Sequence, residues 1–545
     1  MARRAKLHTL HTLLQAGQQA PLPRAAHRQV KNNAGGFVFK VSDWERLDRF
    51  LILGSEGGSY YASPKALTVE NADAVLRLIA TDGVGVVARI VSISTAGRAP
   101  RQDPAIFALA LCLKRGEAET RAAAVSAVSA VCRTATQLYA LADVVQTLGG
   151  WGRGTRRAFA AWYTDRGEQS LALQAVKYQQ REGWSHRDLL RLCHPKAPTP
   201  GHQALYRWMC KGFEDGVPDV VPTESLRLPW AMAQAQAHAA SPATVAAFVR
   251  AHRLPRECLP STALKSPAVW EALLLTDGGM PLTAMLRNLA SMTAVGVFQR
   301  SQKALERVIS SLTDPVALRA ARVHPLSVLV ALETYRRGKG VKGSLAWTPE
   351  PKLLAALNRA FYVAFSAIEG SGRRHLLAID VSGSMECGTV AGMTGISPRV
   401  GAAAMAMATL KAEPSVEVVA FSDKLVPVDL SRDKTLESVV DHLRQIPMGG
   451  TDCAAPMLYA VEKRLKIDVF VVYTDSETWS GAVHPVEALR RYRQASGIQA
   501  KLIVVGMLSN RFTVADPTDP GMLDVVGFDT NAPQVMADFA RRSAA

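Results

Sequence analysis

The stretch Ala378-Ile379-Asp380-Val381-Ser382-Gly383-Ser384-Met385 decides how the C-terminal part of this chain folds. An apolar run leads into it, and a continuous aliphatic run is typical of a buried parallel strand. The loop after this run carries one carboxylate and two hydroxyls at alternate positions. Such side chains can converge on one hard cation, which prefers oxygen ligands. Taken alone, the pattern also fits an ordinary strand-to-helix cap.

Two further segments place oxygen ligands beside this loop. Residues 467–475 form a second apolar strand that ends in a carboxylate, and a glycine pair at 449–450 opens a helical pattern between the two strands. Ligand sites in open α/β sheets lie beyond the carboxyl ends of the strands. We therefore expect one group of residues to hold Mg²⁺ or another divalent cation: Asp380, Ser382, Ser384, Thr451 and Asp475. The alternative is a Rossmann-like sheet with capped helices and no metal.

This group resembles the metal-ion-dependent adhesion site of von Willebrand factor A domains. The Asp-x-Ser-x-Ser, Thr and Asp elements of that family occur here in the family's order. The resemblance implies a bound Mg²⁺. Since Mg²⁺ prefers octahedral coordination, an open position would favour water or an acidic group from a partner protein.

Strand and helix patterns alternate after residue 370, which predicts a doubly wound α/β domain over residues 371–545. The expected strands are 375–380, 416–422, 425–430, 468–474, 500–506 and 524–528. The expected helices are 397–412, 436–446, 452–466, 483–495 and 531–542. The loop at 386–396 is longer than the metal motif requires, and its role does not follow from the residues.

Residues 1–370 carry a different pattern. Residues 1–35 are expected to form a mobile arm, and from about residue 44 apolar residues recur at helical spacing, with no persuasive strand. Helices of about 10–15 residues joined by short Gly or Pro connections predict an irregular α-helical solenoid, although no repeat of about 40 residues is legible.

Composition limits the class of protein. The chain has 545 residues, 48% of them hydrophobic, and its seven cysteines form no C-x-x-C pair, which favours a reducing compartment. No stretch reaches the ~18 consecutive apolar residues of a membrane span. A cytoplasmic protein without a membrane partner is expected.

The net charge of +17 is unevenly distributed. Residues 371–545 contain 18 basic and 20 acidic residues, whereas residues 1–370 contain 46 basic and 27 acidic ones, a net charge of +19. Excess positive charge in one part of a chain indicates a polyanion partner. A merely soluble basic surface is the alternative.

The densest basic segment with interleaved aromatic residues lies between Trp151 and Lys196. We expect Lys177 and Arg181 to be neighbours on one helix face, with a second basic stripe on the helix that follows. Basic side chains position a phosphate backbone. The candidate RNA contacts are Lys177, Arg181, His186, Arg187, Arg191 and His194.

Five stretches, at residues 47–61, 97–104, 183–192, 280–289 and 323–326, resemble the TROVE family. The resemblance covers nearly the whole chain. It implies a HEAT-like α-helical solenoid closed into a ring, with the A domain as its clasp. It also implies binding of small noncoding Y-type RNA on the outer surface, with Lys177, Arg181 and His194 as contacts, and of single-stranded 3′ ends of misfolded RNA in a central hole. An exoribonuclease is an implied partner.

The expected function is therefore RNA binding in noncoding-RNA quality control, without catalysis. A metal-dependent protein-binding adaptor with no RNA role is the alternative, and the confinement of positive charge to residues 1–370 argues against it. Metal-assisted hydrolysis at Asp380 and Asp475 is weakly supported, because no general base stands out nearby.

Overall fold

The structure is a computed structural model that describes residues 21–22, 26–54, 64–99, 101–277, 279–321, 323, 325–340, 344–364, 370–390, 396–508, 511–526 and 532–541. The chain forms two compact units. The helical unit comprises residues 75–97 and 102–364, and the second unit, called the A unit below, comprises the residues up to 74, residues 98–101 and those from 365 onward.

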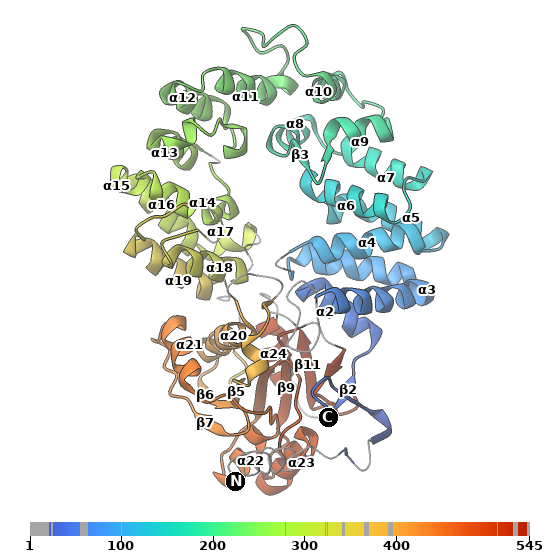
Figure 1. Cartoon of the computed structure of the whole chain (residues 1–545), viewed down its shortest axis with the longest axis vertical. Coiled ribbons are helices and arrows are strands. Elements are labelled where there is room, and N and C mark those ends of the chain that lie inside the picture. Colours follow the sequence, from blue (N-terminus) through green and yellow to red (C-terminus); the bar gives the residue numbers. More distant parts are fainter. Residues whose placement is uncertain are drawn as a thin grey trace, which may run out of the picture. The chain divides into compact units, whose positions relative to one another are not determined.

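The helical unit consists of helices that follow one another along the chain (Figure 1). Its first half contains α3 (Pro64–Ala96, which begins in the A unit), α4 (Asp103–Arg115), α5 (Ala118–Val131), α6 (Ala135–Thr147), α7 (Arg153–Thr164), α8 (Glu168–Lys177), α9 (His186–Cys193) and α10 (Pro200–Lys211). The second half contains α11 (Arg227–Ala237), α12 (Pro242–His252), α13 (Pro267–Leu275), α14 (Leu282–Ala294), α15 (Val297–Arg300), α16 (Gln302–Thr313), α17 (Pro315–Ala320), α18 (Pro325–Arg336) and α19 (Pro351–Val363). Short 3-10 helices, η2 (Glu224–Leu226), η3 (Arg256–Cys258) and η4 (Ala263–Lys265), connect some of them.

Neighbouring helices of this unit pack in pairs, such as α4 with α5, α12 with α13 and α18 with α19. Local sequence explains where several of them begin. The Ser185 hydroxyl accepts the backbone N–H of Asp188 at 3.4 Å, and the Asp188 carboxylate accepts the N–H of Ser185 at 2.9 Å, a capping box that starts α9. Prolines occupy the first turn of α4, α10, α12 and α13, where a missing N–H costs no helical hydrogen bond.

The expectation of no strand before residue 370 was wrong. Residues Gln180–Arg181 (β3) and Trp184–Ser185 (β4) form a short antiparallel hairpin between α8 and α9. Gly183 has a φ of +76°, a conformation that glycine adopts readily, and it allows the chain to turn there. Strands of two residues are too short to leave a legible period in the sequence.

The A unit contains a six-stranded sheet in the order β11-β9-β8-β5-β6-β7. The strands are β5 (Arg374–Asp380), β6 (Ser415–Phe421), β7 (Leu425–Pro427), β8 (Val469–Thr474), β9 (Lys501–Gly506) and β11 (Met522–Val526). All neighbouring pairs are parallel except β6 with β7. The chain leaves β5 toward β6 on one side and returns through β8 on the other, so the carboxyl end of β5 is the point where the strand order reverses. The expected doubly wound sheet is confirmed.

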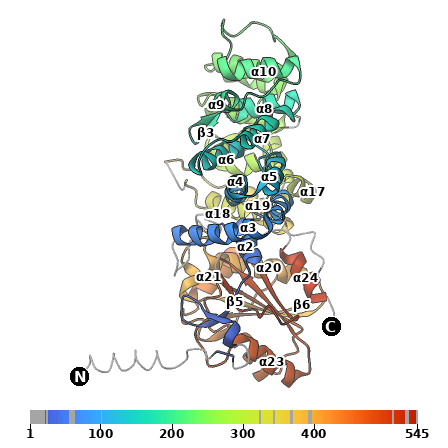
Figure 2. The ribbon, with the colours of Figure 1, turned by 90° about the vertical axis from the view of Figure 1, so that its right-hand side faces the viewer.

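Helices cover both faces of this sheet (Figures 1 and 2). Helices α20 (Pro398–Ala412), α21 (Leu436–Gln445) and α24 (Ala532–Arg541) lie on one face, and α22 (Ala455–Glu462) and α23 (Pro485–Ser496) lie on the other. Met457 of α22 and Leu489 of α23 belong to the same buried cluster as Phe470 and Val472 of β8. The sheet is thus buried on both sides, which explains why its strands read as continuous apolar runs.

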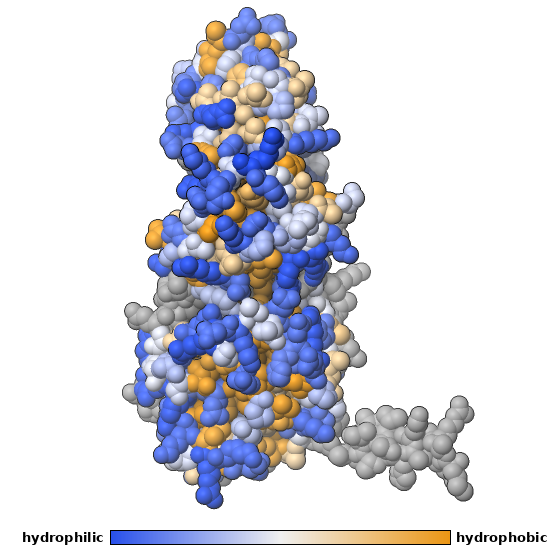
Figure 3. Space-filling model, turned by 90° about the vertical axis from the view of Figure 1, so that its left-hand side faces the viewer, coloured by the Kyte–Doolittle hydropathy of each residue, from blue (hydrophilic) through white to orange (hydrophobic). Residues whose placement is uncertain are grey.

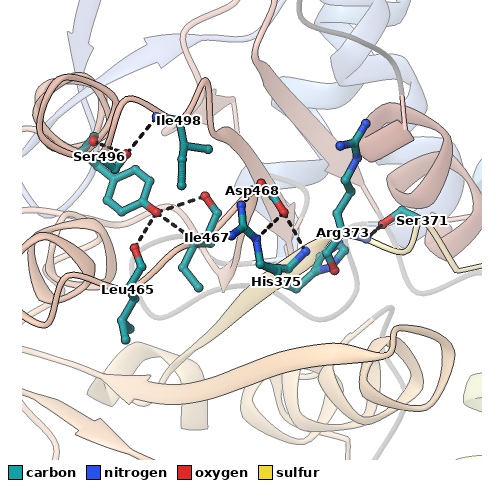
Figure 4. A network of polar contacts seen from close by, with 10 residues as sticks. Ser371, Arg373, His375, Leu465, Ile467, Asp468, Ser496 and Ile498 are labelled. Carbon is teal, nitrogen blue, oxygen red and sulfur yellow. Dashed lines mark hydrogen bonds and ion pairs between the residues drawn. The ribbon is translucent and has the colours of Figure 1, made fainter.

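The amino ends of the central strands are fixed by a polar network (Figure 4). Arg374 donates two hydrogen bonds to Asp468, from Nε at 2.8 Å and from Nη2 at 2.6 Å, in a bidentate pair that also lowers the pKa of the aspartate. The Tyr492 hydroxyl donates to the carbonyl of Leu465 at 2.8 Å and accepts the backbone N–H of Ile467 at 2.6 Å. These contacts set the register of β5 and β8 at the edge opposite the candidate metal residues.

The N-terminal segment belongs to the A unit. Residues 1–20 and 23–25 of the expected mobile arm lie outside the described residues, whereas residues 26–35 include secondary structure. They contain η1 (Ala26–Arg28) and β1 (Gln29–Lys31), which pairs with β2 (Phe37–Lys40). Strand β2 in turn pairs with β10 (Phe512–Thr513). Helix α2 (Asp43–Leu53) follows, and its buried Arg49 donates to Asp524 of β11 at 2.5 Å.

On the face shown in Figure 3, hydrophilic side chains are widely spread, with apolar side chains in smaller groups between them. This is the usual composition of a surface that faces water.

Candidate metal and nucleic-acid sites

The first candidate metal loop lies at the carboxyl end of β5. Asp380 is the last residue of the strand, and Ser382 and Ser384 lie at the start of η5 (Gly383–Glu386). The Asp380 carboxylate accepts the backbone N–H of Ser382 at 2.9 Å and the hydroxyl of Thr474 at 2.6 Å. The hydroxyl oxygens of Ser382 and Ser384 are 3.2 Å apart. All three predicted ligands are buried on the same short loop.

The other two predicted ligands lie on adjoining loops. Asp475 directly follows β8, and a hydrogen bond to the Ser384 side chain joins it to the first loop. The Thr451 carbonyl accepts the backbone N–H groups of Trp479 and Ser480, both at 3.0 Å, so the loop before α22 is tied to the loop after β8. Thr451 and Asp475 are almost fully buried. The structure therefore places all five predicted residues on three connected loops at one edge of the sheet.

The electrostatics of this group fit a divalent cation. Burial, and then the charge of Asp475, raise the pKa of Asp380 to about 7, and burial raises the pKa of Asp475 as well. Two buried carboxylates that repel each other are stabilised by a nearby cation. Two carboxylates and three hydroxyls are hard oxygen donors of the kind that Mg²⁺ prefers. Among the described residues, no group of three or more His, Cys, Asp or Glu side chains forms a different metal site.

Two supports of these loops were missed from the sequence. Arg399 of α20 is buried, donates from Nη2 to the carbonyl of Val381 at 2.8 Å, and pairs with Glu386 at 3.0 Å. This ion pair gives a structural role to the first residue of the 386–396 loop; residues 391–395 of that loop lie outside the described residues. A lone arginine in a run of alanine and methionine was the available signal, because such a side chain needs polar partners when buried.

The second missed support is the turn between β1 and β2. Asn33 Nδ2 donates to Glu477 at 2.8 Å, the backbone N–H of Ala34 donates to the same carboxylate at 3.2 Å, and Asn32 Nδ2 donates to the carbonyl of Thr478 at 2.6 Å. These contacts fix the loop that follows Asp475. No local sequence pattern predicts these contacts, since the partners are more than 440 residues apart.

The expected pairing of Lys177 with Arg181 on one helix face was wrong. Lys177 is the last residue of α8, and Arg181 lies in β3 of the hairpin that follows. Tyr178 ends the helix in a non-helical conformation, with φ −128° and ψ 77°, so the two basic side chains do not share a helix. Arg181 is exposed, whereas Lys177 is half-buried and its ammonium lies 5.4 Å from the ring centroid of Tyr178.

Helix α9 separates the remaining candidates into surface and core. Arg187 and Arg191 are exposed and one helical turn apart. His194 is exposed and ends the helix in the left-handed conformation, with φ 45°. His186 is buried, its Nδ1 is 2.9 Å from the Tyr163 hydroxyl, and burial lowers its pKa to about 4. The prediction that His186 contacts RNA was therefore wrong, since its ring is part of the core.

The structure thus combines a helical unit that carries exposed arginines with a von Willebrand factor A-type unit that has oxygen ligands at its strand ends. Residues 374–540 match the Ro60 vWA domain family, and residues 30–218 and 253–335 match the TROVE domain family. The chain belongs to the family of TROVE proteins that carry a Ro60 vWA domain.

Relatives support this assignment over almost the whole length. The chain is 44% identical to the RNA-binding protein RO60 of Deinococcus radiodurans over 95% of this chain and 96% of the relative. It is 37% identical to the RNA-binding protein RO60 of Caenorhabditis elegans over 96% of this chain and 92% of the relative. The crystal structure of the Deinococcus radiodurans RO (RSR) protein matches with a TM-score of 0.69 and 42% identity, covering 92% of this chain and 99% of that chain.

Among the helices that the structure describes, none combines the length and the hydropathy needed to cross a bilayer.

Proposed function

We propose that this protein binds noncoding RNA and acts in RNA quality control, with Y-type RNA on the exposed surface of the helical unit. The observation that carries the proposal is the placement of charge. The positive excess is confined to residues 1–370, and Arg181, Arg187, Arg191 and His194 of this part are exposed within 14 residues of each other. Neutralising phosphates by such side chains releases counterions, which supplies most of the affinity for a nucleic-acid backbone.

Single-stranded 3′ ends of misfolded RNA are the second proposed ligand, bound in the central hole of a helical ring. The family resemblance and the RNA-binding relatives support this part. We place the protein in the cytoplasm, where its seven free cysteines stay reduced.

The A unit is proposed to recruit a protein partner through Mg²⁺. Asp380, Ser382, Ser384, Thr451 and Asp475 would hold the ion, which supplies a Lewis-acidic position for a carboxylate of that partner. An exoribonuclease is the proposed partner class, because a protein that binds defective RNA without degrading it would pass that RNA to a nuclease. In this scheme the chain itself is not an enzyme.

Salt-dependent filter binding with a hairpin RNA tests the RNA proposal. The double variant Arg187→Gln/Arg191→Gln should bind more weakly, and the slope of log affinity against log salt should fall by about 2, or roughly 0.9 for each lost phosphate contact. Arg490→Gln/Arg491→Gln removes the same charge from exposed positions of α23 in the A unit and is the matched control.

Asp380→Ala should leave hairpin binding unchanged, because its loop belongs to residues 371–545, which carry no excess of positive charge. An equal loss in both arginine double variants would show that only net charge matters. Loss of RNA binding in folded Asp380→Ala would make the metal site part of the RNA site. A preparation that binds no RNA but binds an acidic protein in a Mg²⁺-dependent way would support the adaptor function instead.

A further inference from the structure

The helical unit contains a pocket of about 570 Å³ between α8, η2, α11, α12, η3, α13 and α14. Its volume is in the range of small-molecule sites, about 300–1,000 Å³. All of its lining residues lie between Gln169 and Ala284, within one compact unit. None of the metal ligands and none of the exposed arginines of α9 belongs to it.

Basic side chains from three helices and from the connection after α12 line this pocket. They are Lys177, Arg227, Arg253 and Arg256, against the two carboxylates of Glu224 and Glu257. Arg227 donates to Glu224 at 3.1 Å, so the charges of these two residues neutralise each other. The net charge of the remaining lining residues is positive. Lys177, which was expected on an outer helix face, is thus a lining residue of a cavity.

Two polar atoms of the lining are buried and lack a hydrogen-bond partner, the Nε of Arg256 and the Nδ1 of His252. Buried polar atoms in native structures are nearly always paired, so each such atom calls for a ligand or an ordered water. Both side chains are held in place. The Arg256 guanidinium lies 5.9 Å from the ring centroid of Trp270, and the His252 ring stacks on Phe248 with centroids 5.9 Å apart.

Apolar side chains, called the apolar wall below, also line the pocket and include Leu228, Val249, Leu273 and Met280. A free inorganic phosphate would leave this wall in contact with water. A ligand that joins an anion to a larger, weakly polar body would cover both parts, because planar guanidinium groups suit phosphate oxygens while apolar walls suit a base or sugar face.

We propose that this pocket binds one nucleoside monophosphate unit, with its phosphate on Arg256 and Lys177 and its nucleoside against the apolar wall. The inference rests on the proposed RNA-binding function for its ligand class. The unit comes either from a nucleotide of single-stranded RNA or from a free nucleotide, and the two sources share the same chemistry. The pocket is separate from the exposed basic surface of α9 and β3.

The test is calorimetric titration of the nucleic-acid-free full-length protein with UMP, with inorganic phosphate and with the oligonucleotide U10. UMP should bind more tightly than inorganic phosphate. Arg256→Gln should weaken UMP binding at least about tenfold, since charge-assisted hydrogen bonds are lost. Ala284→Trp changes no charge but fills the pocket from half-buried Ala284 of α14, and it should also abolish UMP binding. Arg307→Gln removes one exposed arginine from α16, outside the pocket, and should have no effect.

Each variant is compared with wild type by circular dichroism, and agreement of the charge variant with the filling variant excludes an effect of misfolding. Displacement of UMP by U10 identifies single-stranded RNA as the source, and lack of displacement identifies a free nucleotide. Absence of UMP binding in a protein that binds hairpin RNA and U10 overturns the pocket proposal and leaves the RNA function intact. UMP binding without any RNA binding keeps the pocket and overturns the RNA function. An equal loss of UMP binding in Arg307→Gln also overturns the pocket.

Discussion

Replacing His186 by Asn distinguishes a core histidine from an RNA contact. The unfolded side chain has a pKa of 6.5, and burial lowers it to about 4 in the fold. Between these values the unfolded chain binds a proton that the folded chain does not. The free energy of unfolding is therefore fully retained above pH 6.5 and falls as the pH drops toward 4. At 1.36 kcal/mol per pH unit, the shifted pKa of His186 lowers the free energy of unfolding at acidic pH by about 3 kcal/mol.

Asparagine does not titrate, and its amide can still bond the Tyr163 hydroxyl that lies 2.9 Å from Nδ1 of His186. The smaller side chain should cost about 1–2 kcal/mol at pH 7.5, where histidine is neutral in both states. At pH 4.5 the variant should be at least as stable as wild type. Only in wild type does the unfolded chain bind a proton at residue 186 that the folded chain does not bind.

Urea unfolding followed by tryptophan fluorescence at pH 7.5 and 4.5 measures both values, since the Trp162 ring lies 6.4 Å from the His186 ring. His194→Asn is the matched control. His194 is exposed and left-handed, a conformation that asparagine tolerates, so this variant makes the same substitution on the surface without straining the backbone. Hairpin RNA affinity at pH 7.5 should be unchanged in His186→Asn. Weaker RNA binding with an unchanged pH dependence would refute the core assignment.

Three further predictions concern the A unit. Mg²⁺ or Mn²⁺ should raise the melting temperature of protein that has been treated with a chelator, because an ion that binds only the folded state stabilises that state. Asp380→Ala should lose this shift, and a shift that persists in the variant would place the ion elsewhere. Arg49→Met leaves Asp524, whose side chain is 6% exposed, without its ion-pair partner, and should lower the free energy of unfolding in urea by about 3–5 kcal/mol. The double variant Arg49→Met/Asp524→Leu should recover most of this loss; additive effects of the two substitutions would contradict the pairing. In Gly36→Ala, the new methyl carbon would lie 1.8 Å from a backbone carbonyl oxygen, so the melting temperature should fall by several degrees. In the control Gly152→Ala the new methyl carbon meets nothing within 4 Å, so the melting temperature should stay near that of wild type. Equal effects of the two substitutions would show that the β1–β2 turn is not tightly packed.

The candidate metal ligands could be predicted from the sequence because each lies after an apolar strand or before a helix. The carboxyl ends of parallel strands meet at one edge, so local pattern and sheet topology together bring the loops of Asp380, Thr451 and Asp475 side by side. Their supports were not accessible. Arg399 and Asn33 act through partners that no local period specifies.

The candidate RNA contacts show where prediction from helical spacing fails. A basic residue every third or fourth position indicates one face only if the helix continues. Helix α8 ends at Lys177, so Lys177 and Arg181 do not share a helix. The turn at Gly183 leads into α9, whose first residue, His186, lies in the core. Short irregular connections decided which of these side chains reach the surface.

The sequence by itself determined the two kinds of architecture, the order of strands and helices after residue 370, and the segregation of positive charge. The reason is that hydrophobic periodicity reports which side chains are buried and local composition reports the charge. Only the tertiary structure decided that the N-terminal strands belong to the A unit, pairing β2 with β10, and that Lys177 lines a pocket with Arg256. The physical reason is that periodicity records whether a side chain is buried but not against what. Partners hundreds of residues apart, such as Arg49 and Asp524, are selected by packing and by the need to pair buried polar groups.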